Sequence, residues 1–79
     1  MTITKLSRTM KAAGYEKESG RYFSHEELCT VSYTVYSKAG KEAMEVKNVN
    51  GAWAVDFIHP DFTAEMARMG LAVGTVLDC

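Results

Sequence analysis

The dipeptide Asn50-Gly51 constrains the fold more than any other feature of the chain. Both residues tolerate the positive φ angles of a two-residue type I′ turn, which joins neighbouring antiparallel strands. Apolar and polar residues alternate on both sides of it, over 41–49 and 52–58. Alternation with a period of two is typical of a strand that buries one face. The sequence therefore predicts a β-hairpin over 41–58.

A third alternating segment precedes this hairpin and begins at Leu28. The face that we expect to lie against the core carries Cys29, Val31, Tyr33 and Val35. The opposite, polar face carries Thr30, Ser32, Thr34 and Tyr36. The tetrapeptide Ser37-Lys38-Ala39-Gly40 supplies a short turn into the next strand, with a glycine available for positive φ.

The two later strands have predicted core faces as well. In 41–49, Met44 and Val46 share one face. In 52–58, the residues expected in the core are Trp53, Val55 and Phe57. His59-Pro60 ends this strand, because proline cannot donate a hydrogen bond to a strand ladder. Together the three segments predict a three-stranded antiparallel sheet.

Two segments with helical periodicity flank the predicted strands. The apolar stripe of the first consists of Ile3, Leu6, Met10 and Ala13. It predicts a helix over about 3–13, with Thr2 or Thr4 as N-cap and Gly14 as the left-handed residue after its end. The stripe of the second consists of Phe62, Met66 and Met69. It predicts a helix over about 62–69, with Asp61 as N-cap and Gly70 at its end.

The remaining segments lack a clear period. Residues 15–27 are rich in charge and contain Ser19-Gly20, so we expect a turn or an irregular connection there. The apolar tail 71–77 can add a short fourth strand, which Gly74 disfavours. The predicted fold class is therefore α+β: a two-layer sandwich of a three-stranded antiparallel sheet and two helices in the order α-β-β-β-α. We expect a single domain over residues 1–79.

The size and charge of the chain exclude several classes of protein. With 79 residues it can bury one modest core, which is too little for a large multi-site enzyme. A net charge of -1 argues against a dedicated nucleic-acid binder. No apolar run approaches the roughly 18 residues of a membrane span, and basic residues interrupt the N-terminal segment where a secretory signal would be apolar. Cys29 and Cys79 can form at most one bridge, so free thiols in the cytoplasm are expected.

The order α-β-β-β-α resembles the double-stranded-RNA-binding domain family across most of the chain. This resemblance implies RNA contacts by basic residues of the first helix and first hairpin, namely Lys5, Arg8, Lys11, Lys38 and Lys41. The chain departs from the family at its last helix, where Asp61-Phe62-Thr63-Ala64-Glu65 stands in place of a lysine cluster. Residues 1–49 carry 8 basic and 6 acidic groups, net +2, whereas residues 50–79 carry 1 basic and 4 acidic groups, net -3. Nucleic-acid binding is therefore kept as an alternative.

His25 and Cys29 have the i, i+4 spacing of zinc ligands on a helix, with Glu26 beside the histidine. A small metal-dependent hydrolase that uses His25 and Cys29 is thus a second alternative. A catalytic zinc needs three protein ligands, and the other histidine, His59, has no ligand spacing of its own. No glycine-rich phosphate loop occurs. We expect no enzymatic activity, no metal and no cofactor.

Binding without catalysis is the function that remains. An aromatic residue on a polar sheet face offers contact area at small entropic cost. The expected binding residues are Thr30, Ser32, Thr34, Tyr36 and Lys38. In size and near-neutral charge the chain is similar to small inhibitor proteins of phages and other mobile elements, anti-CRISPR proteins among them. This similarity implies a protein-binding module that blocks a host complex by steric occlusion, as a monomer or as a homodimer paired through a free strand edge.

Overall fold

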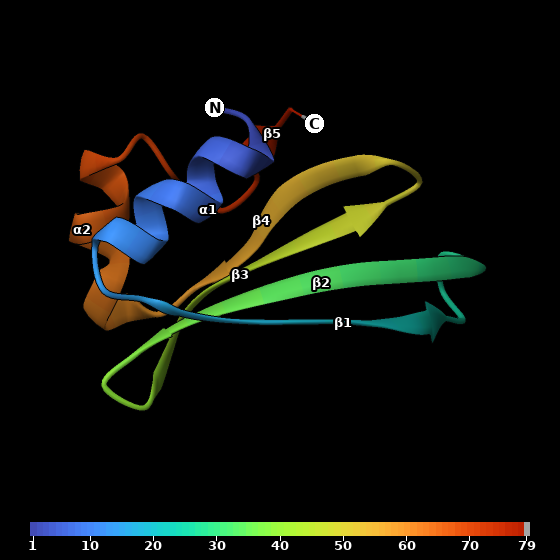
Figure 1. Ribbon diagram of the computed structural model, residues 1–79. Helices are drawn as coiled ribbons and strands as arrows, with labels where there is room; N and C mark the ends of the chain where they lie inside the picture. Colours follow the sequence, from blue (N-terminus) through green and yellow to red (C-terminus); the bar gives the residue numbers. More distant parts are fainter. Residues whose placement is uncertain (79) are drawn as a thin grey trace.

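The computed structural model describes residues 1–78 and places five antiparallel strands and two helices in an α+β arrangement (Figure 1). The elements are α1 (Ile3–Ala12), β1 (Glu16–Ser24), β2 (Cys29–Lys38), β3 (Lys41–Val49), β4 (Ala52–Ile58), the 3-10 turn η1 (Pro60–Phe62), α2 (Thr63–Arg68) and β5 (Val76–Leu77). The strands follow one another across the sheet in chain order. The predicted α+β class, antiparallel sheet and pair of helices are confirmed, but the predicted count of three strands is wrong.

The segment expected to be irregular, 15–27, contains the edge strand β1. It pairs with β2 along its whole length, from Glu16 opposite Ser37 to Ser24 opposite Cys29. Hydrophobic periodicity does not reveal this strand, because its side chains are mostly polar and exposed on both faces. Main-chain pairing with β2 forms the strand instead. The possible C-terminal strand over 71–77 is present only as β5, which pairs with β4 through two residues.

The local signals around α1 act as predicted. The Thr2 hydroxyl accepts a hydrogen bond from the Lys5 backbone N–H at 3.0 Å, which makes Thr2 the N-cap. After the helix, Gly14 has φ +89° and donates to the Lys11 carbonyl, and Tyr15 donates to the Met10 carbonyl. This double hydrogen bond is a Schellman motif, and it places Tyr15 in the core.

The second helix begins later than predicted. Residues Pro60–Phe62 form η1, and α2 starts at Thr63. The expected N-cap, Asp61, lies inside η1, where its backbone N–H donates to the Nδ1 atom of His59 at 3.1 Å. The proline fixes a φ suited to the first position of such a turn, so the chain turns immediately after β4.

The face assigned to β2 is reversed in the structure. Tyr36 is 1% exposed and belongs to the core cluster, whereas Tyr33 and Val35 lie on the other face and are half-buried. Val31, on that other face, is buried as predicted, with 2% exposure, but it is not a member of the core cluster. Tyr36 stands opposite Met44, and cross-strand neighbours share a face. The sequence of β2 favours the wrong face, because three hydroxyl residues, Thr30, Ser32 and Thr34, accompany Tyr36 on the face that lies against the core. The face that Met44 and Val46 share was predicted correctly. Because Tyr36 stands opposite Met44, that face determines which face of β2 lies against the core.

A β-bulge explains the error in β4. Glu45 pairs with Phe57 and Val46 pairs with Val55, which leaves Asp56 as the extra residue. The alternation therefore changes phase: Val55 is buried and Trp53 packs on the core as predicted, but Phe57 is 39% exposed. Ile58 takes the inward position instead.

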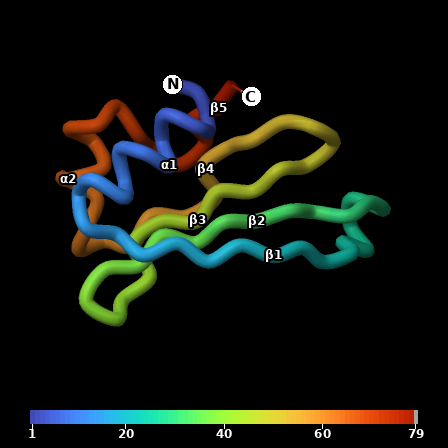
Figure 2. The backbone as a smooth tube through the Cα atoms, in the orientation of Figure 1, coloured from blue at the N-terminus to red at the C-terminus, as the bar shows by residue number. Residues whose placement is uncertain are grey.

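Both predicted hairpin turns are confirmed by their backbone angles. Asn50 and Gly51 have φ +53° and +85°, and Ala39 and Gly40 have φ +53° and +79°. These are the paired positive angles of type I′ turns. The core lies between the helices and one end of the sheet, and it consists mainly of Leu6, Met10, Tyr15, Tyr36, Ala43, Met44, Val46, Val55, Met66, Leu71 and Leu77. Figure 2 shows that the far end of the β1–β2 hairpin extends beyond both helices.

Candidate functional site

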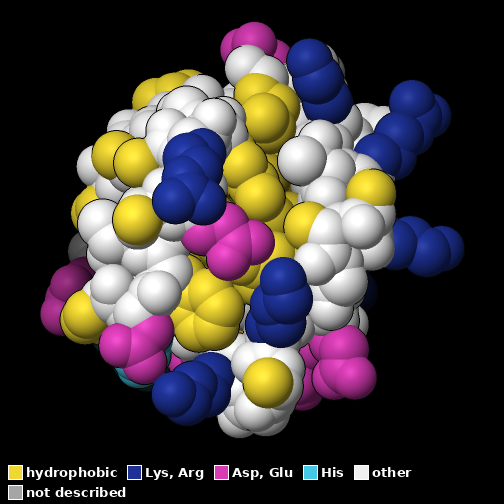
Figure 3. Space-filling model, turned by 90° about the vertical axis from the view of Figure 1, so that its left-hand side faces the viewer, with side chains coloured by type: hydrophobic (Ala, Val, Ile, Leu, Met, Phe, Trp, Pro, Cys, Tyr) yellow, Lys and Arg dark blue, Asp and Glu magenta, His cyan; other side chains and the backbone are white. Residues whose placement is uncertain are grey.

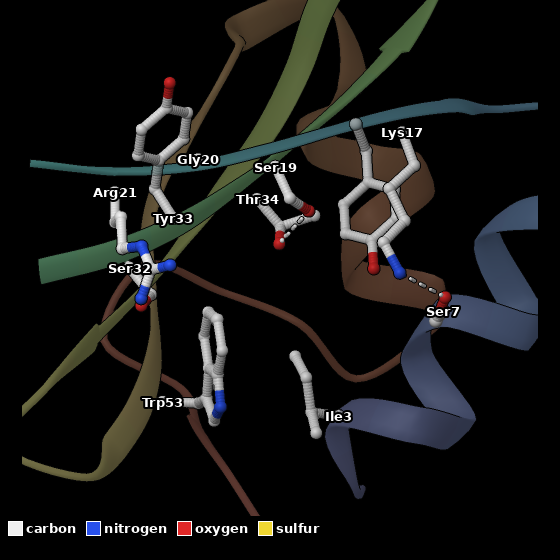
Figure 4. Close-up of a pocket in the computed structure, with 11 residues that line it drawn as sticks. Ile3, Ser7, Lys17, Ser19, Gly20, Arg21, Ser32, Tyr33, Thr34 and Trp53 are labelled. Carbon is white, nitrogen blue, oxygen red and sulfur yellow. Dashed lines mark hydrogen bonds between the residues drawn. The ribbon is translucent and has the colours of Figure 1, made fainter.

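A shallow groove of about 450 Å³ lies on the helix-bearing face of the sheet, beside α1 (Figure 4). Its floor comes from β1 and β2, and one side comes from α1 and Trp53 of β4. Six of its eleven lining residues carry hydroxyl groups: Ser7, Ser19, Ser32, Tyr33, Thr34 and Tyr36. The side chains of Ile3 and Trp53 stand side by side at one end (Figure 4). The groove exists because α1 borders this part of the sheet without covering it.

Two hydrogen bonds order the polar lining (Figure 4). The Lys17 ammonium donates to the Ser7 hydroxyl at 3.1 Å and so links β1 to α1. The hydroxyls of Ser19 and Thr34 lie 2.9 Å apart across the β1–β2 pair. Thr34 is buried and satisfied by this contact.

The charges of β1 separate onto the two faces of the strand. Lys17 and Arg21 line the groove, whereas Glu16 and Glu18 occupy the alternate positions on the outer face. Among the described residues that line the groove, none is Asp or Glu. The groove is therefore a positively charged surface in a chain with a net charge of -1.

A smaller pocket of about 220 Å³ continues the groove along α1 and is lined by Ser7, Lys11, Tyr15, Lys17 and Tyr36. Burial raises the pKa of Tyr36, and the Ser7 hydroxyl partly offsets that rise. Burial, with the nearby Glu65 carboxylate, raises the pKa of Tyr15 to about 12. The Tyr15 hydroxyl is buried without a hydrogen-bond partner among residues 1–78. Both tyrosines stay neutral at physiological pH.

The second exposed feature is the tip of the β1–β2 hairpin, formed by Tyr22, Phe23 and the turn 25–28. Phe23 is 55% exposed, and Leu28 is 77% exposed. Leu28 also has φ +54°, in the left-handed region that glycine and asparagine favour. The Ser24 hydroxyl accepts a hydrogen bond from the Glu27 N–H at 3.2 Å, which fixes the start of the turn. The tip thus holds large apolar side chains in water.

The residues predicted to bind are separated by the fold. Ser32, Thr34 and Tyr36 meet in the groove, although Tyr36 is a core residue and not an exposed aromatic. Thr30 is exposed next to the hairpin tip, opposite Phe23. Lys38 lies at the other end of the sheet, with Nζ 3.7 Å from a Glu65 oxygen and 4.7 Å from the Tyr15 ring centre. Sequence reasoning missed Lys17 and Arg21, because it did not recognise β1 as a strand.

The residues considered for a metal site do not form one. His25 lies in the turn with its ring against Phe23, and Cys29 begins β2, so no helix brings the two side chains to one face. Over residues 1–78, no three His, Cys, Asp or Glu side chains cluster as metal ligands would. The expected pairing state of Cys79 lies outside the described residues.

The end of the molecule that carries α2 and the β2–β3 hairpin shows apolar surface in a hollow between charged side chains (Figure 3). Ion pairs already link the two sides at this end: Lys38 with Glu65, and Lys41 with Asp61 at 3.3 Å. Surface pairs of this kind contribute about 0–1 kcal/mol each. This end is therefore internally paired, unlike the groove.

The sequence matches no protein-family model, and neither curated sequences nor solved structures gave a significant match. Neither of the helices in residues 1–78 is long and apolar enough to cross a membrane.

Proposed function

We propose that the chain is a protein-binding module without catalytic activity, which inserts the tip of its β1–β2 hairpin into an apolar pocket of a partner protein. The observation that carries this proposal is Leu28, which is 77% exposed at φ +54°. A left-handed conformation destabilises a leucine by about 1–2 kcal/mol, and the exposed side chain does not offset this by burial in the core. A strained and exposed apolar residue of this kind is typical of a contact site.

The surroundings of Leu28 indicate the chemistry of the partner. Phe23 and Tyr22 add apolar area on the adjacent strand, and Glu26 and Glu27 precede Leu28 in the turn. Apolar anchors at the centre of an interface supply most of its affinity, and charges at the rim guide association. The partner surface is therefore an apolar pocket with a basic rim. The rest of this small chain blocks access to that surface, as expected for an inhibitor that acts by occlusion.

The sequence supports two further parts of the proposal. The chain is placed in the cytoplasm, because two cysteines are too few for the disulfide framework of a small secreted domain. It acts on a complex of the host cell in the manner of small phage and mobile-element inhibitors, which it is similar to in size and charge.

The test compares two variants that relieve the same backbone strain at different hairpins. Leu28→Asn removes the apolar side chain at the tip, and Ala39→Asn makes the matched change at the β2–β3 turn, where Ala39 has φ +53°. Both variants should unfold at the same or a higher temperature than the parent, because asparagine tolerates positive φ. Proteins captured from a bacterial lysate on each immobilised variant are quantified by mass spectrometry, and each candidate partner is then purified and titrated.

We expect a partner that binds the parent and Ala39→Asn equally and binds Leu28→Asn at least tenfold more weakly. Equal capture by all three proteins would contradict the role of the tip. Light scattering decides whether the tip instead binds a second copy of the chain: a dimer that Leu28→Asn converts to a monomer would replace the host partner with self-association.

A further inference from the structure

The sheet face turned away from the helices, which we call the outer face, is uncovered and largely apolar. Both helices pack on the other face, over the core (Figure 1). Residues directly opposite each other in neighbouring strands lie on one face, so the register defines the outer face from Val31, Tyr33 and Val35 of β2. The other strands add these apolar residues to it: Tyr22, Val49, Ala52, Ala54, Phe57 and Val76. A solvated face of an antiparallel sheet normally carries polar side chains instead.

The aromatic part of the outer face is fixed by its own packing. The Tyr33 side chain points to the side of the sheet opposite Trp53 and the groove (Figure 4). A Cβ atom at Gly20 would lie 2.5 Å from the Tyr33 hydroxyl oxygen, so the ring can occupy this place only beside a glycine. The Tyr22 ring centre lies 6.2 Å from that of Tyr33, and Val31, opposite Tyr22, is 2% exposed without a helix above it. A partner therefore meets an ordered apolar surface, which lowers the entropic cost of binding.

Acidic side chains accompany the apolar ones on this face. The register places four glutamates there: Glu16, Glu18, Glu42 and Glu45. One row across the sheet consists, in order, of Glu18, Val35, Glu45 and Phe57. Within residues 1–78, Lys47 is the one basic residue on this face, and its ammonium already lies 3.1 Å from Asp56 and 3.8 Å from Glu45. The other three glutamates form no ion pair in that part of the chain, so the outer face is a negatively charged surface.

The basic side chains lie mainly on the opposite side of the sheet. Lys17 and Arg21 of β1 line the groove, and α1 carries Lys5, Arg8 and Lys11. The outer faces of two copies do not suit each other, because their carboxylates would meet and repel. Charge complementarity therefore favours a basic occupant for the outer face.

We propose that the outer face binds an amphipathic helix of a partner protein, one that flanks its apolar stripe with lysine and arginine. A helix is the element that covers a second sheet face in layered folds. Its stripe would lie on Phe57 and Val76, which are 39% and 67% exposed. Its cations would meet Glu18 and Glu45. Five strands span about 19 Å, a width that about 13 helical residues cross. This surface is distinct from Leu28 at the tip and does not depend on the partner proposed above.

The probe is a fluorescein-labelled peptide of leucine and lysine, about 18 residues long and patterned as an amphipathic helix. Anisotropy titrations compare it with a peptide of the same composition in scrambled order, and with a peptide in which glutamate replaces lysine. We expect saturable binding of the amphipathic basic peptide and at least tenfold weaker binding of the other two. No saturable binding, or equal binding of the scrambled peptide, would overturn the proposal.

Methyl NMR spectra of the parent protein locate the peptide without any substitution. The signals of Val35 and Val76 should shift on binding. Those of Val73, which is 64% exposed between α2 and β5, should not. Shifts confined to Leu28 would place the peptide on the tip and contradict the outer face, while the proposal for the tip would stand.

Matched variants separate the outer face from the tip. Glu18→Lys and Glu26→Lys change the net charge equally, but Glu18 lies on the outer face and Glu26 lies in the turn at the tip. Only Glu18→Lys should weaken peptide binding at least tenfold, and equal losses would show a general charge effect and contradict the site. Phe57→Ser should weaken binding to a similar extent, whereas Leu28→Ser should leave it unchanged. Circular dichroism confirms that each variant is folded, and Val76→Ser, at a more exposed residue, replaces Phe57→Ser if that variant unfolds.

Light scattering of the parent protein at low and high salt tests whether another copy of the chain covers the outer face. We expect a monomer at both salt concentrations. The basic helix side of one copy could instead stack on the outer face of the next, which would give an open chain of copies. A salt-sensitive assembly that Glu18→Lys disperses would show this arrangement and would contradict a partner helix.

Discussion

The two halves of the helix-bearing face differ in chemistry because the helices are shorter than the strands beneath them. The ten residues of α1 span about 15 Å, whereas the ten residues of β2 span about 33 Å. Met44, Val46 and Val55 lie under the helices and are fully buried. Lys17 lies at the edge of α1, where it contacts Ser7, Arg21 lies farther along β1, and both are exposed. A sheet that extends past its covering layer must therefore present polar side chains there, and these side chains become available for binding.

The largest expected effect concerns Tyr36, which stands at the boundary between the halves. Tyr36→Ala should destabilise the fold by about 3–5 kcal/mol, because a fully buried aromatic ring leaves a cavity when it is removed. Ser32→Ala, on the same face of β2 but in the uncovered half, should cost less than about 0.5 kcal/mol. Urea denaturation measures both. If both variants lost similar amounts of unfolding free energy, Tyr36 would belong to the polar surface, and the two halves of the face would not differ as described.

The next effect is a dependence of stability on alkaline pH. The pKa of Tyr15 is about 12 in the folded protein and about 10 in an unfolded chain. Between these values the folded state keeps a proton that the unfolded state loses, so stability is complete below pH 10 and falls as the pH rises toward 12. The loss should reach roughly 2–3 kcal/mol.

Tyr15→Phe is the control for this dependence. It removes the ionisable group together with the hydroxyl that lacks a partner, so the alkaline slope should become shallower without loss of stability at pH 7. A remaining slope is expected from Tyr36, whose pKa burial also raises. Denaturation midpoints at pH 8 to 12 give the comparison. If the dependence of stability on alkaline pH were unchanged in Tyr15→Phe, Tyr15 would not be buried beneath the helices.

A smaller effect is expected at the turn that sets the register of β3 and β4. Gly51→Val should destabilise by about 1–2 kcal/mol, since valine at φ +85° is strained and no side chain surrounds the site to compensate. Asn50→Gly keeps a residue that tolerates positive φ and should change stability by less than about 1 kcal/mol. Thermal unfolding measures both variants. If Asn50→Gly unfolded at a lower temperature than Gly51→Val, the assignment of this turn would be contradicted.

The smallest expected effect concerns a hydrogen bond in the polar half of the helix-bearing face. Thr34→Val keeps the shape of a buried residue and removes its hydrogen bond to Ser19. Ser19 is exposed and can bond to water, so stability should change by about 0.5 kcal/mol or less in either direction. A loss above about 1 kcal/mol would show that the hydroxyls of the groove hold the sheet together. Calorimetric unfolding of the variant and the parent resolves this difference.

The sequence allowed correct prediction of those parts of the fold that depend only on a few neighbouring residues. The Asn50-Gly51 turn, the Thr2 cap and the role of Gly14 depend on a few consecutive residues. Strand β1 could not be found in this way, because its pairing with β2 and not its own side chains makes it a strand. The orientation of Phe57 depends on a bulge against β3, which no feature within 52–58 reveals.

The candidate site was predictable only in part. Ser32 and Thr34 were selected as members of a polar strand face, and the structure places them in the groove. Lys17 and Arg21 required knowledge that 16–24 is extended. The available signal was the alternation of acidic residues with basic and hydroxyl residues in Glu16-Lys17-Glu18-Ser19, which a period of two separates onto opposite faces. Leu28 gave no signal, since a positive φ at leucine is not expected from sequence.

The two described ends of the chain lie side by side, and this makes the backbone almost a ring (Figure 1). Thr2 forms a parallel bridge with Asp78, the Ile3 N–H donates to the Asp78 carbonyl at 2.7 Å, and the Asp78 N–H donates to the Met1 carbonyl at 3.1 Å. A short linker from residue 78 to residue 1 could close this ring, and a cut at Ala39-Gly40 would open it with every strand still beside its neighbour. A circular permutant of this kind would carry new termini at the β2–β3 turn, while the tip of the β1–β2 hairpin would remain unobstructed at the opposite end of the sheet.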